Sequence, residues 1–129
     1  MIRKLVIAGA LLLSATMSMS AADRYYEMRT YHTYEGKLDA LLTRFRDHTV
    51  QLFEKHGMTN IGYWIPVDKP NTLIYILSYP SKEAREKSWA DFQKDPDWVK
   101  ARTASEANGK IVEKVDQQFM TPTDFSKLK

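Results

Sequence analysis

Residues 72–79 form the segment that most restricts how this chain folds. The segment contains no Gly or Pro, and all its residues except Ser78 are β-branched, aromatic or aliphatic, so it predicts a β-strand. Successive side chains in a strand point to opposite faces. One face therefore carries Leu73, Tyr75, Leu77 and Tyr79, and the other carries Ile74 and Ile76. A strand that is apolar on both faces lies inside a sheet and needs cover on both sides.

The rest of the chain predicts three more strands and three helices. Tyr- and Thr-rich or otherwise β-favouring stretches predict strands at 24–34, 59–67 and 111–121. Apolar residues recur at helical spacing from Lys37 to His56, and Gly57 is expected to end that helix in a left-handed conformation. Ser81 is expected to cap the next helix, and Asp95 followed by Pro96 to start another helix over 97–108.

This order of elements predicts an α+β fold. The sequence strand, helix, strand, strand, helix pair, strand is the ferredoxin-like βαββαβ arrangement with its second helix split in two. The first and third strands are central in that topology, and the helices cover one face of the sheet. The second apolar face then requires a partner, and we expect a homodimer; the alternative is a monomer with a partly apolar sheet surface.

The first 22 residues predict export. Arg3 and Lys4 precede an apolar stretch at 5–13, which is far shorter than the roughly 20 residues that span a bilayer. Small residues ending at Ala22 then suit signal peptidase. We expect residues 1–22 to be a signal peptide and 23–129 to be the domain, which is periplasmic or secreted and has no stable membrane anchor.

Composition argues against several other classes of protein. Residues 1–22 contain two basic and no acidic side chains, so 17 of the 19 basic residues remain in the domain against 16 acidic ones. This near balance of charge does not indicate a nucleic-acid-binding protein, because such proteins need an excess of basic residues to neutralise phosphates. The absence of Cys excludes disulfides, thiolate metal sites and a Cys nucleophile.

An ordered set of short stretches resembles NIPSNAP family proteins. The set covers about residues 24–127 and consists of 26–31, 36–38, 45–49, 52–58, 61–64, 71–75, 85–89 and 95–98. The resemblance implies a dimeric α/β barrel, in which two ferredoxin-like sheets join and each subunit holds a cavity between sheet and helices. That superfamily includes cofactor-free monooxygenases, haem-degrading enzymes and isomerases. The signal peptide and single short domain depart from the animal NIPSNAP pattern, so a mitochondrial role is not implied.

Glu27 and Arg29 lie two residues apart and share a face of the first strand with Tyr31. An ion pair on a central strand is stable out of water only when its partners satisfy it. Two interpretations stay open. One is a structural charge network at the dimer seam, and the other is an Arg29 that orients a ligand with Glu27 as acid or base.

The three histidines do not predict a metal site. His48 and His56 are about 12 Å apart along one helix, and His32 on the first strand can approach only one of them. We expect His56 to bond free carbonyls at the helix end. His48 lies beside the apolar stripe and is the preferred proton-transfer residue.

The expected ligand site combines these residues with aromatic ones. Trp89 and Phe92 at helical spacing are expected in the core, and Trp64 either lines a pocket for a flat ligand or packs under the helices. We expect ligand contacts from Glu27, Trp64, Tyr75 and Trp89, and catalytic roles, where there is catalysis, for His48, Arg29 and Tyr31.

Three functional hypotheses follow. The first is a binding domain that holds a small apolar or aromatic ligand in a homodimer without a cofactor. The second is a cofactor-independent monooxygenase or isomerase in which His48, Tyr31 and Arg29 position an acidic aromatic substrate. The third is a protein-docking module that uses the sheet face. No Gly-x-Ser-x-Gly elbow or phosphate-binding loop supports a hydrolase or a nucleotide-binding protein.

The export hypothesis predicts the N-terminus of the purified protein. When the full chain is expressed in a bacterium with its own leader, N-terminal sequencing of the exported fraction should begin at Asp23, because cleavage is expected after Ala22. Exchange of Ala22 for Arg should leave the precursor uncut. An exported protein that still begins at Met1 would contradict the expectation.

Overall fold

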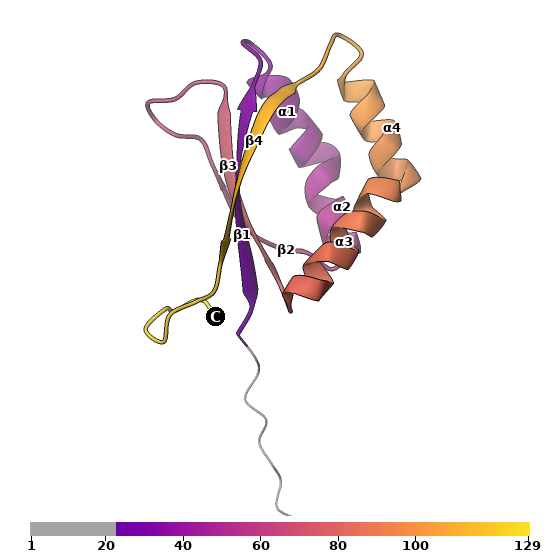
Figure 1. Ribbon diagram of the computed structural model, residues 1–129. Helices are drawn as coiled ribbons and strands as arrows, with labels where there is room; N and C mark the ends of the chain where they lie inside the picture. The colour runs from indigo at the N-terminus through magenta and orange to yellow at the C-terminus, as the bar shows by residue number, and fades with distance from the viewer. Residues whose placement is uncertain (1–22) are drawn as a thin grey trace, which may run out of the picture.

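The computed structural model describes residues 23–129, and it places four antiparallel strands in one sheet with the helices on one of its faces (Figure 1). The elements in chain order are β1 (Tyr25–Thr33), α1 (Leu38–Arg44), the π-helical segment η1 (Phe45–Thr49), α2 (Val50–Lys55), β2 (Thr59–Trp64), β3 (Thr72–Tyr79), α3 (Lys82–Lys94), α4 (Pro96–Ser105) and β4 (Val112–Met120). The predicted signal peptide lies outside the described residues. Within the described part, no helix is long and apolar enough to cross a membrane.

The strand order is β2-β3-β1-β4, so the first and third strands are central as predicted. β1 pairs with β3 on one side and with β4 on the other, and both pairings are antiparallel. Arg29 is thereby placed opposite Tyr75 on one neighbour and opposite Gln117 on the other. The ferredoxin-like βαββαβ prediction, with a second helix made of two pieces, is confirmed.

The first helical layer runs without a break from Leu38 to Lys55, but its middle turn is π-helical. Thr49 takes part in this wide turn, since its hydroxyl donates to the carbonyl of Arg44, five residues earlier, at 3.3 Å. Single π turns are rare and frequently occur at functional sites. The helix ends at Lys55, and Gly57, two residues later, has a φ of 81°, the left-handed conformation predicted for that position.

The second helical layer consists of α3 and α4, and both begin at the predicted capping residues. The Ser81 hydroxyl accepts from the backbone N–H of Ala84 at 3.0 Å, and the Asp95 carboxylate accepts from that of Asp97 at 2.9 Å. Asp95 also accepts from Lys55 and contacts His56, each at 2.7 Å. His56 therefore joins the two helical layers through a carboxylate, and the predicted bonds to free carbonyls are wrong for this side chain.

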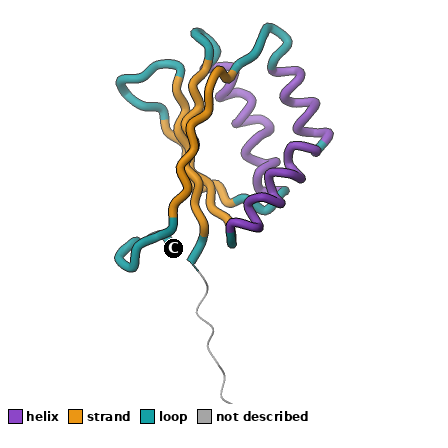
Figure 2. The backbone as a smooth tube through the Cα atoms, viewed as in Figure 1, coloured by secondary structure: helices purple, strands orange, loops and turns teal. Residues whose placement is uncertain are grey.

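The helices lie over one face of the sheet (Figure 2), and the core side chains pack between these two layers. On β3 the helix-facing residues Leu73, Tyr75, Leu77 and Tyr79 are at most 2% exposed. Trp89 and Phe92 of α3 are buried in the same core, as predicted. Ile74 and Ile76, on the other face of β3, are only half-buried. The two-faced apolar pattern of this strand is therefore confirmed, and no described element covers its second face.

The uncovered face also contains Trp64. Tyr63 lies opposite Tyr75 and stacks on it in the core, so its neighbour Trp64 points the other way and is 51% exposed. The Trp64 ring lies so close above Gly62 that a Cβ there would collide with it. Met28 of β1 lies opposite Ile76, which continues the apolar strip.

Candidate functional site

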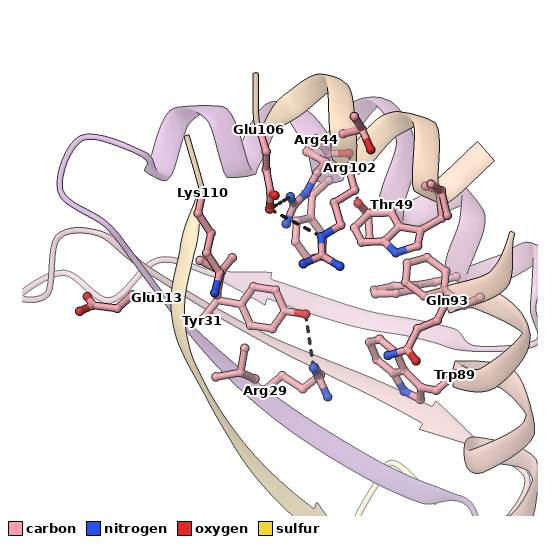
Figure 3. A pocket seen from close by; sticks show the side chains of 18 of the residues that line it. Arg29, Tyr31, Arg44, Thr49, Trp89, Gln93, Arg102, Glu106, Lys110 and Glu113 are labelled. Carbon is pink, nitrogen blue, oxygen red and sulfur yellow. Dashed lines mark hydrogen bonds and ion pairs between the residues drawn. The ribbon is translucent and has the colours of Figure 1, made fainter. Parts of the chain in front are cut away.

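A hollow of about 790 Å³ lies between the sheet and the helices, beside the core. β1 and β4 contribute its sheet side, and all the helical segments contribute to the opposite wall (Figure 3). Its aromatic lining consists of Tyr31, Phe45, Phe53, Trp89, Phe92 and Trp98. Its lining also contains two buried guanidinium groups, those of Arg29 and Arg44, which are 8% and 5% exposed. The site is thus an aromatic cavity with charged groups in its wall.

Glu27 organises the charge beneath this cavity. Its side chain is fully buried, and its two oxygens accept five hydrogen bonds. Arg29 donates at 2.7 Å and Arg85 donates twice, at 2.9 and 3.1 Å. The other two donors are Tyr79 at 2.7 Å and Gln117 at 3.2 Å. A carboxylate offers about four lone-pair positions, so no position is left for a ligand.

The surroundings of Glu27 keep it ionised. Burial by itself raises the pKa of this carboxyl, but the hydrogen bonds from Arg85 and Tyr79 and the charge of Arg29 outweigh burial, so the pKa ends below its usual value. An acid that is fully bonded and held as an anion is a poor proton-transfer group. For Glu27 the structure supports the charge network and argues against a role as acid or base, whereas Arg29 also reaches the cavity wall. The structure places that network on the helix-covered face, not at the expected dimer seam, because the partners come from α3 and β3.

Arg29 connects this network to the cavity. Its guanidinium carbon lies 4.3 Å from the centre of the Trp89 ring, a cation–π contact, and its Nη2 donates to the Tyr31 hydroxyl at 3.4 Å. The Tyr31 hydroxyl also accepts from Tyr75 at 2.9 Å. Tyr75 is completely buried, and burial raises the pKa of its phenol well above the usual value. Tyr75 supports the site from beneath and does not line it.

Arg44 forms a second buried cluster that was not predicted from the sequence. Its Nη1 donates to Ser105 at 3.3 Å and lies 3.6 Å from the carboxylate of Glu106. The same Glu106 oxygen lies 3.6 Å from Nε of Arg102. The Arg44 guanidinium also packs 5.2 Å from the centre of the Trp98 ring. The sequence does contain a signal for the burial of Arg44. This residue is three positions after Leu41 and next to Phe45, so helical spacing places it on the buried face.

Each buried arginine of the cavity wall retains an unused donor. Among the described residues, Nε of Arg29 and Nε of Arg44 are the buried side-chain nitrogens without a hydrogen-bond partner. Such groups are uncommon in folded proteins, because an unpaired buried donor is costly. Burial lowers the pKa of Arg44, and Tyr31 and Glu106 only partly oppose that shift.

The structure brings together some of the predicted site residues and separates others. Arg29, Tyr31 and Trp89 line the cavity, with Glu27 and Tyr75 directly beneath. His48 is exposed and contributes to a separate, smaller hollow between the helical layers. Trp64 lies on the opposite face of the sheet, so it neither lines this cavity nor packs under the helices. Proton transfer by His48 stays a prediction, but not one that this cavity supports.

The other two histidines have carboxylate partners. His32 contacts Asp116 across β1 and β4 at 2.8 Å, and His56 contacts Asp95. Within residues 23–129, no three His, Asp or Glu side chains gather in a way that suits a metal ion.

The chain matches the family model described as NIPSNAP over residues 26–127. A search of curated proteins finds no match. Among solved structures, a NIPSNAP family protein from Agrobacterium tumefaciens is 25% identical with a TM-score of 0.72, covering 83% of this chain and 95% of that one. A NIPSNAP-like domain protein from Burkholderia xenovorans is 17% identical with a TM-score of 0.70, covering 81% and 89%.

A more distant likeness extends to an enzyme. SnoaB, a cofactor-independent oxygenase from Streptomyces nogalater, is 16% identical with a TM-score of 0.59, covering 82% of this chain and 99% of that one. At this identity the likeness concerns the fold, which confirms the ferredoxin-like dimeric α/β barrel class.

The buried network predicts the effect of Glu27→Gln. A neutral amide leaves the buried Arg29 without its counter-charge and the partly buried Arg85 with Glu86 alone, so the free energy of unfolding at pH 7 should fall by about 3 kcal/mol. The exposed Glu35→Gln change is the control and should have little effect. Urea denaturation monitored by circular dichroism measures both.

The same variant predicts a change in acid sensitivity. Because the folded-state pKa of Glu27 lies below its unfolded value, its stabilisation is present above about pH 4.3 and is lost as the pH falls through the folded-state pKa. The melting temperature of the unaltered protein should therefore fall more steeply below about pH 4 than that of Glu27→Gln. Parallel curves would contradict the role given to this carboxylate.

Proposed function

Since the chain belongs to the NIPSNAP family, we propose that it is a binding domain that holds a small apolar or aromatic ligand in the cavity of a homodimer. The cavity itself carries the proposal: about 790 Å³ is within the range of small-molecule sites, and six aromatic side chains line it. The lining also contains charged and polar side chains, so the aromatic part of the wall suits the apolar body of a ligand and the polar part suits an end group on it. Export through the predicted signal peptide places this binding role in the periplasm or outside the cell.

The enzymatic alternative has less support from the geometry. A cofactor-independent oxygenase or isomerase requires a residue that can take a proton from a bound substrate. Glu27 is saturated with donors, His48 lies in another hollow, and Tyr75 is buried with a raised pKa. Binding without chemistry is therefore the function that we propose.

The second copy is expected on the uncovered face of the sheet. Met28, Ile74 and Ile76 form an apolar strip there, with Trp64 at its edge. Two copies related by a twofold axis present the same strip to each other, so one surface satisfies both. The docking of a different protein on this strip is the competing outcome.

A cavity-filling substitution tests the ligand site. Val99 of α4 is exposed at the cavity wall, so Val99→Trp should fill the space and weaken the binding of 2-naphthamide, a neutral aromatic probe, at least about tenfold. Isothermal titration calorimetry measures the affinity. The matched control is Lys100→Trp, one residue further on the same helix and outside the cavity lining. Equal affinities in the two variants, or no binding to the unaltered protein, would contradict the proposal.

A charged side chain on the apolar strip tests the dimer. Analytical ultracentrifugation at micromolar concentration should show a dimer, and Ile76→Lys should weaken it at least about a hundredfold, because it places an unpaired charge in the interface twice. Val67→Lys, on the loop between β2 and β3, should leave the dimer intact. If the unaltered protein is a monomer, the proposed dimer is wrong. If Ile76→Lys dimerises as tightly as the unaltered protein, the interface lies elsewhere.

A further inference from the structure

The charges around the cavity are arranged in two clusters, and in each of them two guanidinium groups share one carboxylate. In the first, Arg29 and Arg85 share Glu27. In the second, which comes from the helical layers, Arg44 and Arg102 share Glu106. Arg85 also lies 3.4 Å from the carboxylate of Glu86, so the first cluster is close to neutral. Among the described residues the second cluster has two guanidiniums for one carboxylate and keeps about one uncompensated positive charge.

The cavity lies between these two clusters. Arg29 contributes to it from the first cluster, and Arg44, Arg102 and Glu106 contribute from the second (Figure 3). The surplus continues at its edge, where the lining residues are Lys110, Glu113 and Lys114. The described lining therefore contains five basic and two acidic side chains, although the domain as a whole is close to neutral. The positive charge is concentrated at the cavity.

Hydrogen-bond donors are also available there. Nε of Arg29 and Nε of Arg44 are buried without a partner in the described part of the chain. The Tyr31 hydroxyl accepts from both Arg29 and Tyr75, so its own hydrogen remains to be donated. Unused donors beside surplus positive charge match an anion, because hydrogen bonds to an ionised acceptor are the stronger kind.

We propose that the ligand of this cavity is a small aromatic carboxylate. Its acidic group binds Arg29, Arg44 and Tyr31, and its ring packs among the aromatic side chains that include Trp89 and Trp98. This inference rests on the proposed binding function and specifies its ligand class. A carboxylate with one negative charge suits the site better than a phosphate with nearly two, since the second cluster keeps about one uncompensated positive charge. The aromatic side chains of the wall suit a ligand body that is flat and apolar.

The test compares one ring system with different end groups. Isothermal titration calorimetry with 2-naphthoate, 2-naphthamide and 2-naphthyl phosphate measures what the acidic group contributes. The unaltered protein should bind 2-naphthoate about 10 to 100 times more tightly than 2-naphthamide, as expected for hydrogen bonds to a charged group. Binding of 2-naphthyl phosphate should be weaker than that of 2-naphthoate.

Two variants locate the effect. Arg44→Gln should reduce the preference for 2-naphthoate over 2-naphthamide to less than about threefold, because only the acid loses hydrogen bonds to a charged group. The ratio of the two affinities is the readout, so a change in cavity shape that weakens both ligands equally cancels. The matched control is Arg46→Gln, which removes the same charge from an exposed position two residues away and should keep the preference. Thermal melts establish that both variants are folded, and the comparison of end groups on the unaltered protein requires no variant.

The outcomes separate this inference from the proposed function. Equal affinities for 2-naphthoate and 2-naphthamide would overturn the carboxylate as the ligand class and leave the proposed binding function intact. Binding of neither would overturn both. Tighter binding of 2-naphthyl phosphate would assign the site to a phosphate, and equal losses in the Arg44 and Arg46 variants would show that general charge, not this site, attracts the acid.

Discussion

The buried carboxylate of Glu27 is the group on which the arrangement of this protein depends. It lies on a central strand beneath the helices, where an ionised group is stable only if it is fully bonded. Arg29 and Arg85 supply the charge, and Tyr79 connects the network to the neighbouring strand. This cluster ties β1, β3, β4 and α3 together, and it holds Arg29 against Trp89 at the cavity wall.

The two faces of the sheet then serve different purposes. The helix-covered face contains the aromatic core, the two arginine clusters and the cavity between them. The other face carries the apolar strip, which no described element covers. If the strip joins two copies and the cavity holds the ligand, as we propose, assembly and binding occupy opposite sides of one sheet.

Local signals in the sequence predicted much of this fold. The left-handed Gly57 and the caps at Ser81 and Asp95 depend on neighbours a few residues away, and they were found from the sequence. Arg29 was also identified as a partner of Glu27, because both lie on one strand. The other partners were not found, because Arg85, for example, is 58 residues distant and reaches Glu27 only through the packing of α3 on the sheet. Arg44 was missed because a charged residue on a helix is normally taken as exposed, whereas this one is buried between helical layers. The outward position of Trp64 depends on which face of β2 the helices cover, and that is a property of the whole fold.

The positively charged side chains of the cavity wall are proposed to bind an acidic ligand. A crystal structure of the protein purified from its own host, without refolding, tests this most directly. We expect electron density for a flat molecule between the sheet and the helices, with two oxygens within hydrogen-bond distance of Arg44. A cavity closed by the surrounding side chains, with the Arg44 guanidinium turned out to solvent, would contradict the claim.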